Sequence, residues 1–409
     1  MQKGNKFRIY PTTEQKIMFA QHFGSGRFIY NKMLEIKQLF YKKFKIILSE
    51  YELSKHLPVL KECYPWLKDV DAWSLQHVNG YLQEAYKNFF RHITDFPRRK
   101  SKKDNHQSYS VMAYKINFET NQIYIPKIGW IKVKLHRDLF DFQFAIHNLE
   151  YTKDVILEQS KNSQYLKKLT ISKTPTDKYY ISILTNDQRD NPQKQHYDES
   201  NTIGVDVGLK SFAVTSNEEV IDNPKYLNKS LRKLKHLQRC ASRKKKGSKN
   251  KKKAVKRLAK CHEKVSNQRH DFQHKLSKQL ICENQAVVIE DLNIKGMLKN
   301  HKLAQSISDA AWSSFIFKLC YKAEWFGKTI LKIGRFEPSS KTCNICGYKK
   351  VNLTLGDREW ICPECNILHD RDINAAKNIK NFVLSSPGRR VELGNSLTRV
   401  KGMNQEVLL

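Results

Sequence analysis

Two pairs of cysteines towards the C-terminal end constrain this chain most strongly. Cys343 and Cys346 form the first pair, Cys362 and Cys365 form the second, and fifteen residues separate the two pairs. Four thiolates at this spacing are typical of a tetrahedral zinc ribbon. Because so short a segment cannot bury a core of its own, its fold is expected to depend on the metal. The sequence therefore predicts one structural Zn²⁺ held by these four side chains.

The chain carries a large excess of positive charge. Of its 409 residues, 74 are Lys or Arg and 40 are Asp or Glu, which leaves a net charge of +34, and its 40% hydrophobic content fits a protein with two or three packed domains. Such a field attracts polyanions and weakens with added salt, which favours nucleic acid as the partner. A membrane partner is disfavoured, because no apolar run is long enough to span a bilayer and no signal peptide follows the first Met.

Hydrophobic spacing divides the chain into regions. A short strand is predicted at 7–10, and a capping box of Thr12 and Gln15 then opens a helical region that runs to about residue 95, broken at Gly24-Ser-Gly26 and at Pro65. Residues 107–186 alternate apolar and basic side chains, which predicts a small antiparallel barrel. The polar residues 187–201 predict a linker.

Three acidic residues stand where a two-metal site would need them. Asp206 lies in the apolar run Ile203-Gly-Val-Asp-Val-Gly-Leu209, Glu290 closes the run Ala286-Val-Val-Ile-Glu290, and Asp372 precedes the small residues Asn374-Ala-Ala376. Taken singly, a strand aspartate or glutamate is more often a structural hydrogen-bond acceptor. Together they come from a first strand, a later parallel strand and a C-terminal helix, as in a ribonuclease H-like fold. Phosphodiester hydrolysis commonly uses two Mg²⁺ ions about 3.5 to 4 Å apart, held by carboxylates.

Asp370 competes with Asp372 for the role of third acid. We choose Asp372, because the small side chains that follow it let the helix approach the sheet closely. Asp370 is better placed to cap the helix or to hold a water in the outer shell. Two other classes of protein fit part of the pattern. A DDE-type transposase would use three carboxylates but does not usually place a zinc ribbon just before the last one, and a purely binding protein would leave the acids unexplained.

Residues 229–275 form the most basic segment, with nineteen Lys or Arg and two acids. A block of like charge is usually a solvated or disordered face. Here leucines and a valine keep helical spacing on both sides of the run Arg243-Lys-Lys-Lys246, so we predict a helical hairpin whose basic tip faces phosphates. The remaining cysteines show no pattern and are expected to be reduced thiols of a cytosolic protein: Cys63, Cys240, Cys261, Cys282 and Cys320.

Together these motifs resemble TnpB, the RNA-guided nuclease encoded by bacterial insertion sequences, which is similar to the small type V CRISPR effectors. The resemblance covers nearly the whole length. After Cys365 the family usually has Gly, whereas this chain has Asn366, a residue that tolerates the left-handed conformation. The matching segments are Phe7-Arg-Ile-Tyr-Pro11 with Gln15, Arg27 with Tyr30-Asn31, Ile125-Pro-Lys-Ile-Gly-Trp-Ile131, Gly204-Val-Asp-Val-Gly-Leu209, Ile289-Glu-Asp-Leu292, Ser340-Lys-Thr-Cys343 and Asp370-Arg-Asp-Ile-Asn-Ala-Ala-Lys-Asn-Ile379.

The resemblance implies a multidomain α/β fold. A small β-barrel called the wedge (1–15 and 107–190) would be interrupted by a helical recognition insertion (16–106). A ribonuclease H-like RuvC domain (202–335 and 373–382) would follow, interrupted by a zinc ribbon (336–372) that ends in the third catalytic acid. Residues 383–409 would form a flexible tail.

The resemblance also implies an activity. A guide RNA made from the transposon end would direct cutting of both strands of DNA beside a short flanking motif, at one RuvC site where Asp206, Glu290 and Asp372 hold two Mg²⁺ ions. We expect a cytoplasmic protein with no membrane partner that is monomeric in its RNA complex. A small type V CRISPR effector and an RNA-guided repressor stay open as alternatives, although the retained acids favour a nuclease. The basic residues expected to contact nucleic acid are Arg8, Arg27, Arg98, Arg99, Lys244, Lys245 and Lys246.

Overall fold

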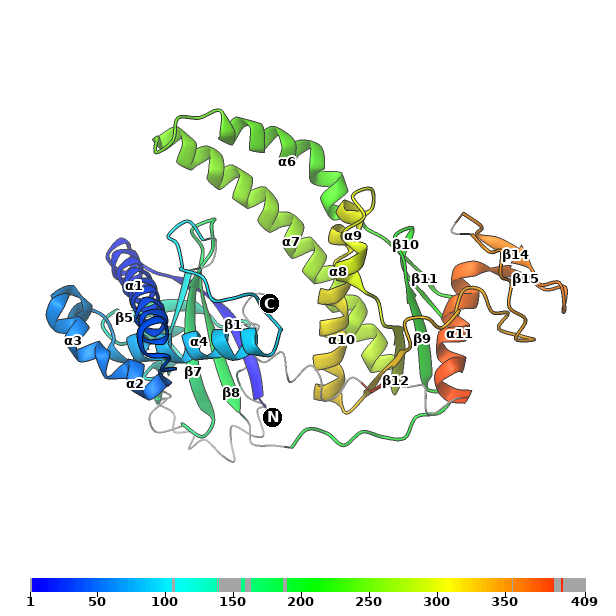
Figure 1. The fold of residues 1–409 in the computed structure, drawn as a ribbon, viewed down its shortest axis with the longest axis horizontal. Coiled ribbons are helices and arrows are strands. Elements are labelled where there is room, and N and C mark those ends of the chain that lie inside the picture. The colour runs from blue at the N-terminus through cyan, green and yellow to red at the C-terminus, as the bar shows by residue number, and fades with distance from the viewer. Residues whose placement is uncertain are drawn as a thin grey trace. The chain divides into compact units, whose positions relative to one another are not determined.

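The computed structural model describes residues 2–104, 107–137, 139, 156–158, 163–186, 190–354, 356–385 and 391–392. The chain divides into two compact units, and the division falls between Asp190 and Asn191 (Figure 1). This point lies within the polar segment predicted to be a linker, and residues 190–198 have no regular secondary structure. Within the described ranges, no helix is both long enough and apolar enough to cross a membrane.

The first unit is built on an eight-stranded antiparallel sheet with the order β2-β7-β8-β1-β5-β4-β3-β6. The antiparallel pairing predicted for 107–186 is confirmed, and β1 lies at the centre of the sheet between β8 and β5. Phe7 and Ile9 of β1 are buried in the core, because alternate residues of a strand face the same side. The strands are β1 Gln2–Tyr10, β2 Gln107–Val111, β3 Lys115–Asn117, β4 Gln122–Ile125, β5 Gly129–Lys134, β6 Ile156–Glu158, β7 Leu166–Lys173 and β8 Tyr179–Asn186.

Helices of the first unit fill the sequence between β1 and β2. The predicted capping box is confirmed: the Gln15 amide donates to Thr12 Oγ1 at 3.3 Å, and the Thr12 amide donates to Gln15 Oε1 at 3.0 Å. The break predicted at Pro65 is also confirmed, because Pro65 begins a separate short helix. The helices are α1 Thr13–Phe44, α2 Glu50–Ser54, α3 His56–Cys63, the 3₁₀ helix η1 Pro65–Asp69 and α4 Ala72–Phe90.

The break predicted at Gly24-Ser-Gly26 is wrong, because α1 runs through it without interruption. Each glycine in a helix interior costs about 1 kcal/mol relative to Ala. Packing against α4 offsets this cost. Ser25 is 2% exposed, and a Cβ added at Gly26 would lie 3.8 Å from Cγ2 of Val78 on α4. This part of α1 therefore packs against α4 and is not an exposed turn.

The second unit contains a six-stranded sheet with the order β11-β10-β9-β12-β13-β16. Strands β9 and β10 form a hairpin around Gly208, since they pair antiparallel. The predicted later strand is confirmed as well, because β12 runs parallel to β9, and β13 runs parallel to β12. The strands are β9 Thr202–Val207, β10 Ser211–Thr215, β11 Val220–Asp222, β12 Ala286–Glu290, β13 Thr329–Ile333 and β16 Val391–Glu392.

Helices cover both faces of this sheet (Figure 1). Odd-numbered strand residues such as Val205 and Ile289 pack with α7 and α10 in one core cluster, whereas Val288 packs with Ile379 of α11 in another. The predicted basic hairpin is present as α6 and α7, joined by a turn at 243–248. The helices are α6 Tyr226–Ser242, α7 Lys249–Glu283, α8 Ile294–Met297, α9 Ala304–Ala310, α10 Trp312–Phe326 and α11 Arg371–Ser385.

The segment between β13 and α11 holds the four cysteines and a two-stranded sheet, β14 Glu359–Ile361 with β15 Leu368–Asp370. Part of the segment 383–409, which the resemblance assigned to a flexible tail, has regular structure. Helix α11 continues to Ser385, where buried Val383 packs beneath the sheet, and Val391–Glu392 pair with β13. Residues 386–390 and 393–409 lie outside the described residues.

Candidate active site and metal centre

Two of the predicted acids lie side by side on neighbouring strands. The parallel register places Gly204 of β9 opposite Val288 of β12. Because every second residue of a strand faces the same side, Asp206 and Glu290 stand two residues further on, on the same face of the sheet. This is the face that α11 covers, since Val288 belongs to the core cluster of Ile379. Glu290 is the last residue of β12, so the pair lies at the carboxyl ends of two neighbouring central strands.

Helix α11 brings the third acid to the same place. A Cβ added at Gly204 would lie 2.2 Å from the carbonyl oxygen of Ala376, so only glycine lets the helix lie this close to β9. Asp372 stands four residues before Ala376, on the same side of the helix. Asp206 stands two residues beyond Gly204 on the strand, so the three acidic residues lie on the same face of the sheet, near the carboxyl ends of β9 and β12.

The electrostatics agree with this placement of the three groups. Burial raises the pKa of Asp206 well above its usual value, and the negative charges of Glu290 and Asp372 raise it further, against a smaller opposing effect of Arg371. Burial also raises the pKa of Glu290. Like charges held in a half-buried site repel each other unless a cation lies between them. The donor set, three carboxylates, is the one that Mg²⁺ prefers.

The structure separates the roles of Asp370 and Asp372. Asp370 Oδ1 accepts hydrogen bonds from the backbone amides of Asp372 at 2.9 Å and Ile373 at 3.0 Å, so Asp370 caps α11. Asp372 leaves its side chain at the site, where Oδ2 lies 3.5 Å from a guanidinium nitrogen of Arg358. Asp370 is the better cap, and Asp372 is the residue whose charge acts on Asp206.

Glu290 and its neighbour Asp291 have different partners. Ser339 Oγ donates to Glu290 Oε1 at 2.5 Å, and this bond partly opposes the pKa rise that burial causes. Asp291 instead pairs with Lys332 at 3.1 Å and with Arg335 at 2.8 Å. Its partial burial would raise its pKa, but these two cations together hold the pKa below its usual value. Asp291 is therefore neutralised within the protein, and Glu290 is not.

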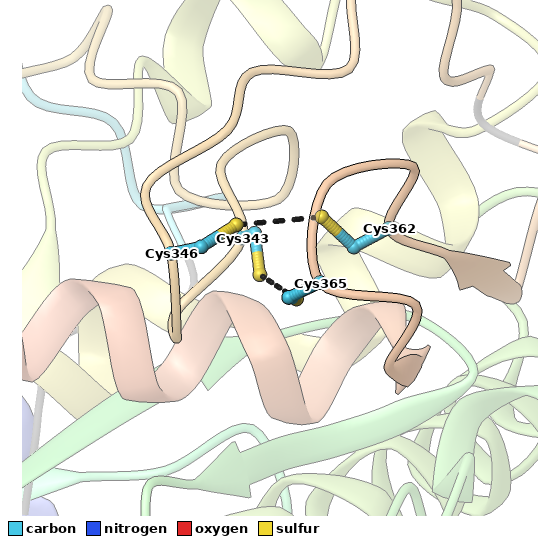
Figure 2. A group of neighbouring side chains, drawn as sticks. All are labelled: Cys343, Cys346, Cys362 and Cys365. Carbon is cyan, nitrogen blue, oxygen red and sulfur yellow. Dashed lines mark hydrogen bonds between the residues drawn. The ribbon is translucent and has the colours of Figure 1, made fainter.

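The four predicted cysteines form a compact cluster in which all the sulfur atoms lie within 4.8 Å of one another. Figure 2 shows the two loops facing each other, with Cys343 Sγ 3.7 Å from Cys365 Sγ and Cys346 Sγ 3.5 Å from Cys362 Sγ. Thiolates bound about 2.3 Å from a tetrahedral Zn²⁺ lie about 3.8 Å apart. The donor set and the spacing therefore fit a structural zinc ion.

The two cysteine loops share one backbone geometry. The amide of Gly347 donates to the Cys343 carbonyl at 3.0 Å, and the amide of Asn366 donates to the Cys362 carbonyl at 2.9 Å. Both residues after the second cysteine are left-handed, with φ of 78° at Gly347 and 54° at Asn366. The expectation that Asn366 would serve in place of glycine is confirmed.

Sequence reasoning missed two residues that touch these sites. His369 is 6% exposed, and its Nε2 lies 3.1 Å from Cys343 Sγ. Its position four residues after Cys365 could have marked it as a neighbour of the cluster. Ser339, which holds Glu290, stands 49 residues away from it in sequence, and no local pattern marks that contact.

The basic residues predicted to contact nucleic acid lie at separate places. Arg8 is half-buried on β1, with its guanidinium over the rings of Tyr10 and Tyr180. Arg27 lies half-buried in α1. Arg98 and Arg99 are exposed in the loop after α4, which Asn31 of α1 clamps through two hydrogen bonds to the backbone of Lys100, at 2.9 and 2.8 Å. The exposed residues Lys244, Lys245 and Lys246 lie in the turn of the α6–α7 hairpin.

Three family models match parts of the chain. Residues 182–301 match OrfB_IS605, described as "Probable transposase", and residues 312–379 match "Cas12f1-like, TNB domain". Residues 1–45 match "Helix-turn-helix domain". In that last range the described residues form β1 and one helix of 32 residues, with no turn between two helices.

Relatives match over almost the full length. A protein of Streptomyces pristinaespiralis named "Putative RNA-guided DNA endonuclease" is 34% identical over 383 residues, which cover 91% of this chain and 87% of the relative. The chain belongs to the TnpB family. "Putative RNA-guided DNA endonuclease InsQ" of Escherichia coli (strain K12) is 26% identical over 411 residues, which cover 96% of this chain and 95% of that relative. A solved Cas12f1-sgRNA-target DNA complex covers 93% of this chain and 99% of that one, at 16% identity and a TM-score of 0.47.

Proposed function

We propose that this TnpB-family protein is an RNA-guided DNA endonuclease that hydrolyses phosphodiester bonds at Asp206, Glu290 and Asp372. The observation that carries the proposal is the convergence of these three carboxylates on one face of the sheet, with raised pKa values for Asp206 and Glu290. The full-length relatives named as RNA-guided DNA endonucleases support the same activity.

The chemistry follows from the charges of the site. Two bound Mg²⁺ ions would activate water and stabilise the leaving oxygen of the phosphodiester. The three carboxylates would hold these ions in their ionised form. Burial and the charges of Glu290 and Asp372 raise the pKa of Asp206, and a bound cation would oppose that rise. Arg358, now 3.5 Å from Asp372, would be free to turn towards a phosphate once the carboxylate binds metal.

The order of strands in the second unit supports a ribonuclease H-like domain of the RuvC type. Three antiparallel strands, β11, β10 and β9, are followed outward by the parallel strands β12 and β13. With α11, these strands would make up the RuvC domain (202–335 and 373–382), and the cysteine segment (336–372) would be its zinc ribbon. The antiparallel sheet of the first unit would be the wedge (1–15 and 107–190), and α1 to α4 the recognition insertion (16–106).

The proposed partners are a guide RNA from the transposon end and double-stranded target DNA. The net charge of +34 supplies the attraction to both. Sequence choice would come from base pairing with the guide, because the protein would read only a short flanking motif. We place this monomeric complex in the cytoplasm, where transcript and target meet. The contacts would include the clamped loop at Arg98 and Arg99 and the hairpin tip at Lys244, Lys245 and Lys246.

Replacing the acids one at a time tests the proposed site. Asp206→Ala, Glu290→Ala and Asp372→Ala should each abolish cutting in Mg²⁺ while RNA and DNA binding remain, measured by gel shift on the same preparations. Asp370→Ala is the matched control, because Asp370 caps α11 and should lose stability rather than chemistry. If Asp370→Ala does not cut DNA and Asp372→Ala does, the third acid is misassigned. If all three acid variants cut normally, the proposed nuclease site is wrong.

Sequencing the RNA that copurifies with the protein tests the guide. A single transcript from the end of the element, whose terminal segment redirects cutting when it is changed, is the expected result. Transcripts derived from repeats would favour a CRISPR effector instead. Guided binding without cutting would favour a repressor. Cutting of a fixed site by protein without RNA would return a DDE-type transposase to consideration.

A further inference from the structure

Two buried asparagines of α11 hold the segment that leads into the cysteine cluster. Asn374 and Asn378 are 1% and 3% exposed. The Asn378 amide donates to the Thr342 carbonyl at 2.5 Å, and the Asn374 amide donates to the same oxygen at 2.7 Å. The backbone amide of Asn344 in turn donates to Asn374 Oδ1 at 3.0 Å. Because Thr342 and Asn344 flank Cys343, these bonds fix the first cysteine loop to α11.

Asn378 also connects the cysteine loop to the carboxylate site. The Asn378 amide also donates to the carbonyl oxygen of Ser339 at 2.7 Å, and the Ser339 hydroxyl donates to Glu290 at 2.5 Å. The turn between is tight, since the amide of Thr342 donates to the Pro338 carbonyl at 3.0 Å. A path of hydrogen bonds therefore runs from the cysteine loop through Asn378 and Ser339 to Glu290.

This path of hydrogen bonds orients one of the acids, Glu290. Asn378 stands on α11, the helix that also carries Asp372. Ser339 is 6% exposed, so water competes little for its hydroxyl, which keeps its hydrogen bond to Glu290. The bond occupies one carboxylate oxygen, Oε1, and fixes the direction of the other. Hydrogen bonds of this kind orient ligands and tune metal affinity.

We infer that Ser339 is a positioning residue for Glu290 and that Asn378 positions Ser339, so that one hydrogen-bond network holds both the cysteine cluster and the carboxylate site. The inference rests on the proposed function, because it takes Glu290 as a metal ligand. It adds residues that act through Glu290 rather than on the substrate. It also explains why a buried Asn stands at 378, where the side-chain amide donates to two backbone carbonyls of one turn.

The first test compares Ser339→Ala with Ser339→Thr in the complex with guide RNA. The alanine variant should need about 10 to 100 times more Mg²⁺ for half-maximal cutting, with a rate at saturating Mg²⁺ close to that of the wild type. Threonine keeps the hydroxyl and should restore the Mg²⁺ dependence. A purely structural role would lower the rate at every Mg²⁺ concentration alike.

A second test measures metal binding and does not depend on DNA cutting. Mn²⁺ binding is followed by electron paramagnetic resonance, and the sites at the acids are counted as the difference from Asp206→Ala. Ser339→Ala should weaken this Mn²⁺ binding by a similar factor while its zinc content stays at one per chain. If its Mg²⁺ and Mn²⁺ curves match those of the wild type, the role of Ser339 is overturned. A wild type that neither cuts nor differs from Asp206→Ala in Mn²⁺ binding would instead remove the proposed function.

The role of Asn378 is tested by coupling. Asn378→Ala should shift the Mg²⁺ dependence in the same direction as Ser339→Ala, and the double variant should shift no further than the larger single effect. Asn381→Ala, the same residue type on the same helix, is the control and should leave the dependence unchanged. Shifts that add in the double variant would show that Asn378 does not act through Ser339 and would overturn that part of the inference.

Discussion

Gly204 is the point where α11 comes closest to the sheet, and Gly204→Ala should move Asp372 away from Asp206. The added Cβ would lie 2.2 Å from the Ala376 carbonyl oxygen, whereas ordinary contact begins at 3.4 Å, so the helix must shift by the difference of about 1.2 Å. A displacement of about 1 Å at reacting groups costs roughly a hundredfold in rate. We expect single-turnover cutting to fall by that order, with binding of guide RNA unchanged.

The variant should still fold, because overpacking costs about 1 to 3 kcal/mol, whereas the free energy of unfolding of a domain is about 5 to 15 kcal/mol. Thermal melting measures this loss beside the cutting rate. The control is Gly24→Ala in α1, where the new Cβ would lie 3.9 Å from Arg27 and should slightly stabilise the helix. A Gly204→Ala protein that cuts at the wild-type rate, or loses only the activity of its unfolded fraction, would refute the argument.

Three further predictions concern charge. Asp206→Asn should raise the melting temperature measured without Mg²⁺, because it removes a carboxylate that is buried beside two like charges, which raise its pKa. Mg²⁺ should then stabilise this variant less than it stabilises the wild type. Burial lowers the pKa of Lys318 from 10.5 to about 8, so the unfolded chain binds more protons between these values. The free energy of unfolding, measured by calorimetry, should therefore rise as the pH increases from about 8 to 10.5, and Lys318→Met should make this rise smaller. Replacing Lys244, Lys245 and Lys246 together by Ala should reduce the salt slope of RNA binding by about 2 to 3, whereas an unchanged slope would exclude phosphate contacts there.

The candidate metal-binding residues could be identified from the sequence because metal chemistry restricts both residue type and spacing. Cys343, Cys346, Cys362 and Cys365 were recognisable from their own separation, and they cluster as expected. Asp206 and Glu290 were recognisable as carboxylates inside apolar runs. Asp372 needed the additional argument that small residues after it admit a close helix, which the contact at Gly204 bears out.

Errors arose where tertiary packing outweighs local preference. Glycines at 24 and 26 disfavour a helix, yet α1 continues because this part of it packs against α4. The resemblance assigned residues from 383 onward to a flexible tail, yet Val383 packs into the core beneath the sheet and α11 continues to Ser385. In both places the burial that decides the outcome involves residues far away in the chain.

By itself, the sequence determined the chemical groups of this protein: four thiolates, three carboxylates, a basic hairpin and the alternation of strands. Only the tertiary structure decided which groups meet. Ser339 reaches Glu290 across 49 residues, and Asn378 reaches Ser339 across 39. Ligand spacing is local and follows from bond lengths, so it is visible in the chain. A hydrogen bond between distant segments exists only because folding has already brought α11, β12 and the cysteine loop together, and no local periodicity encodes that distance.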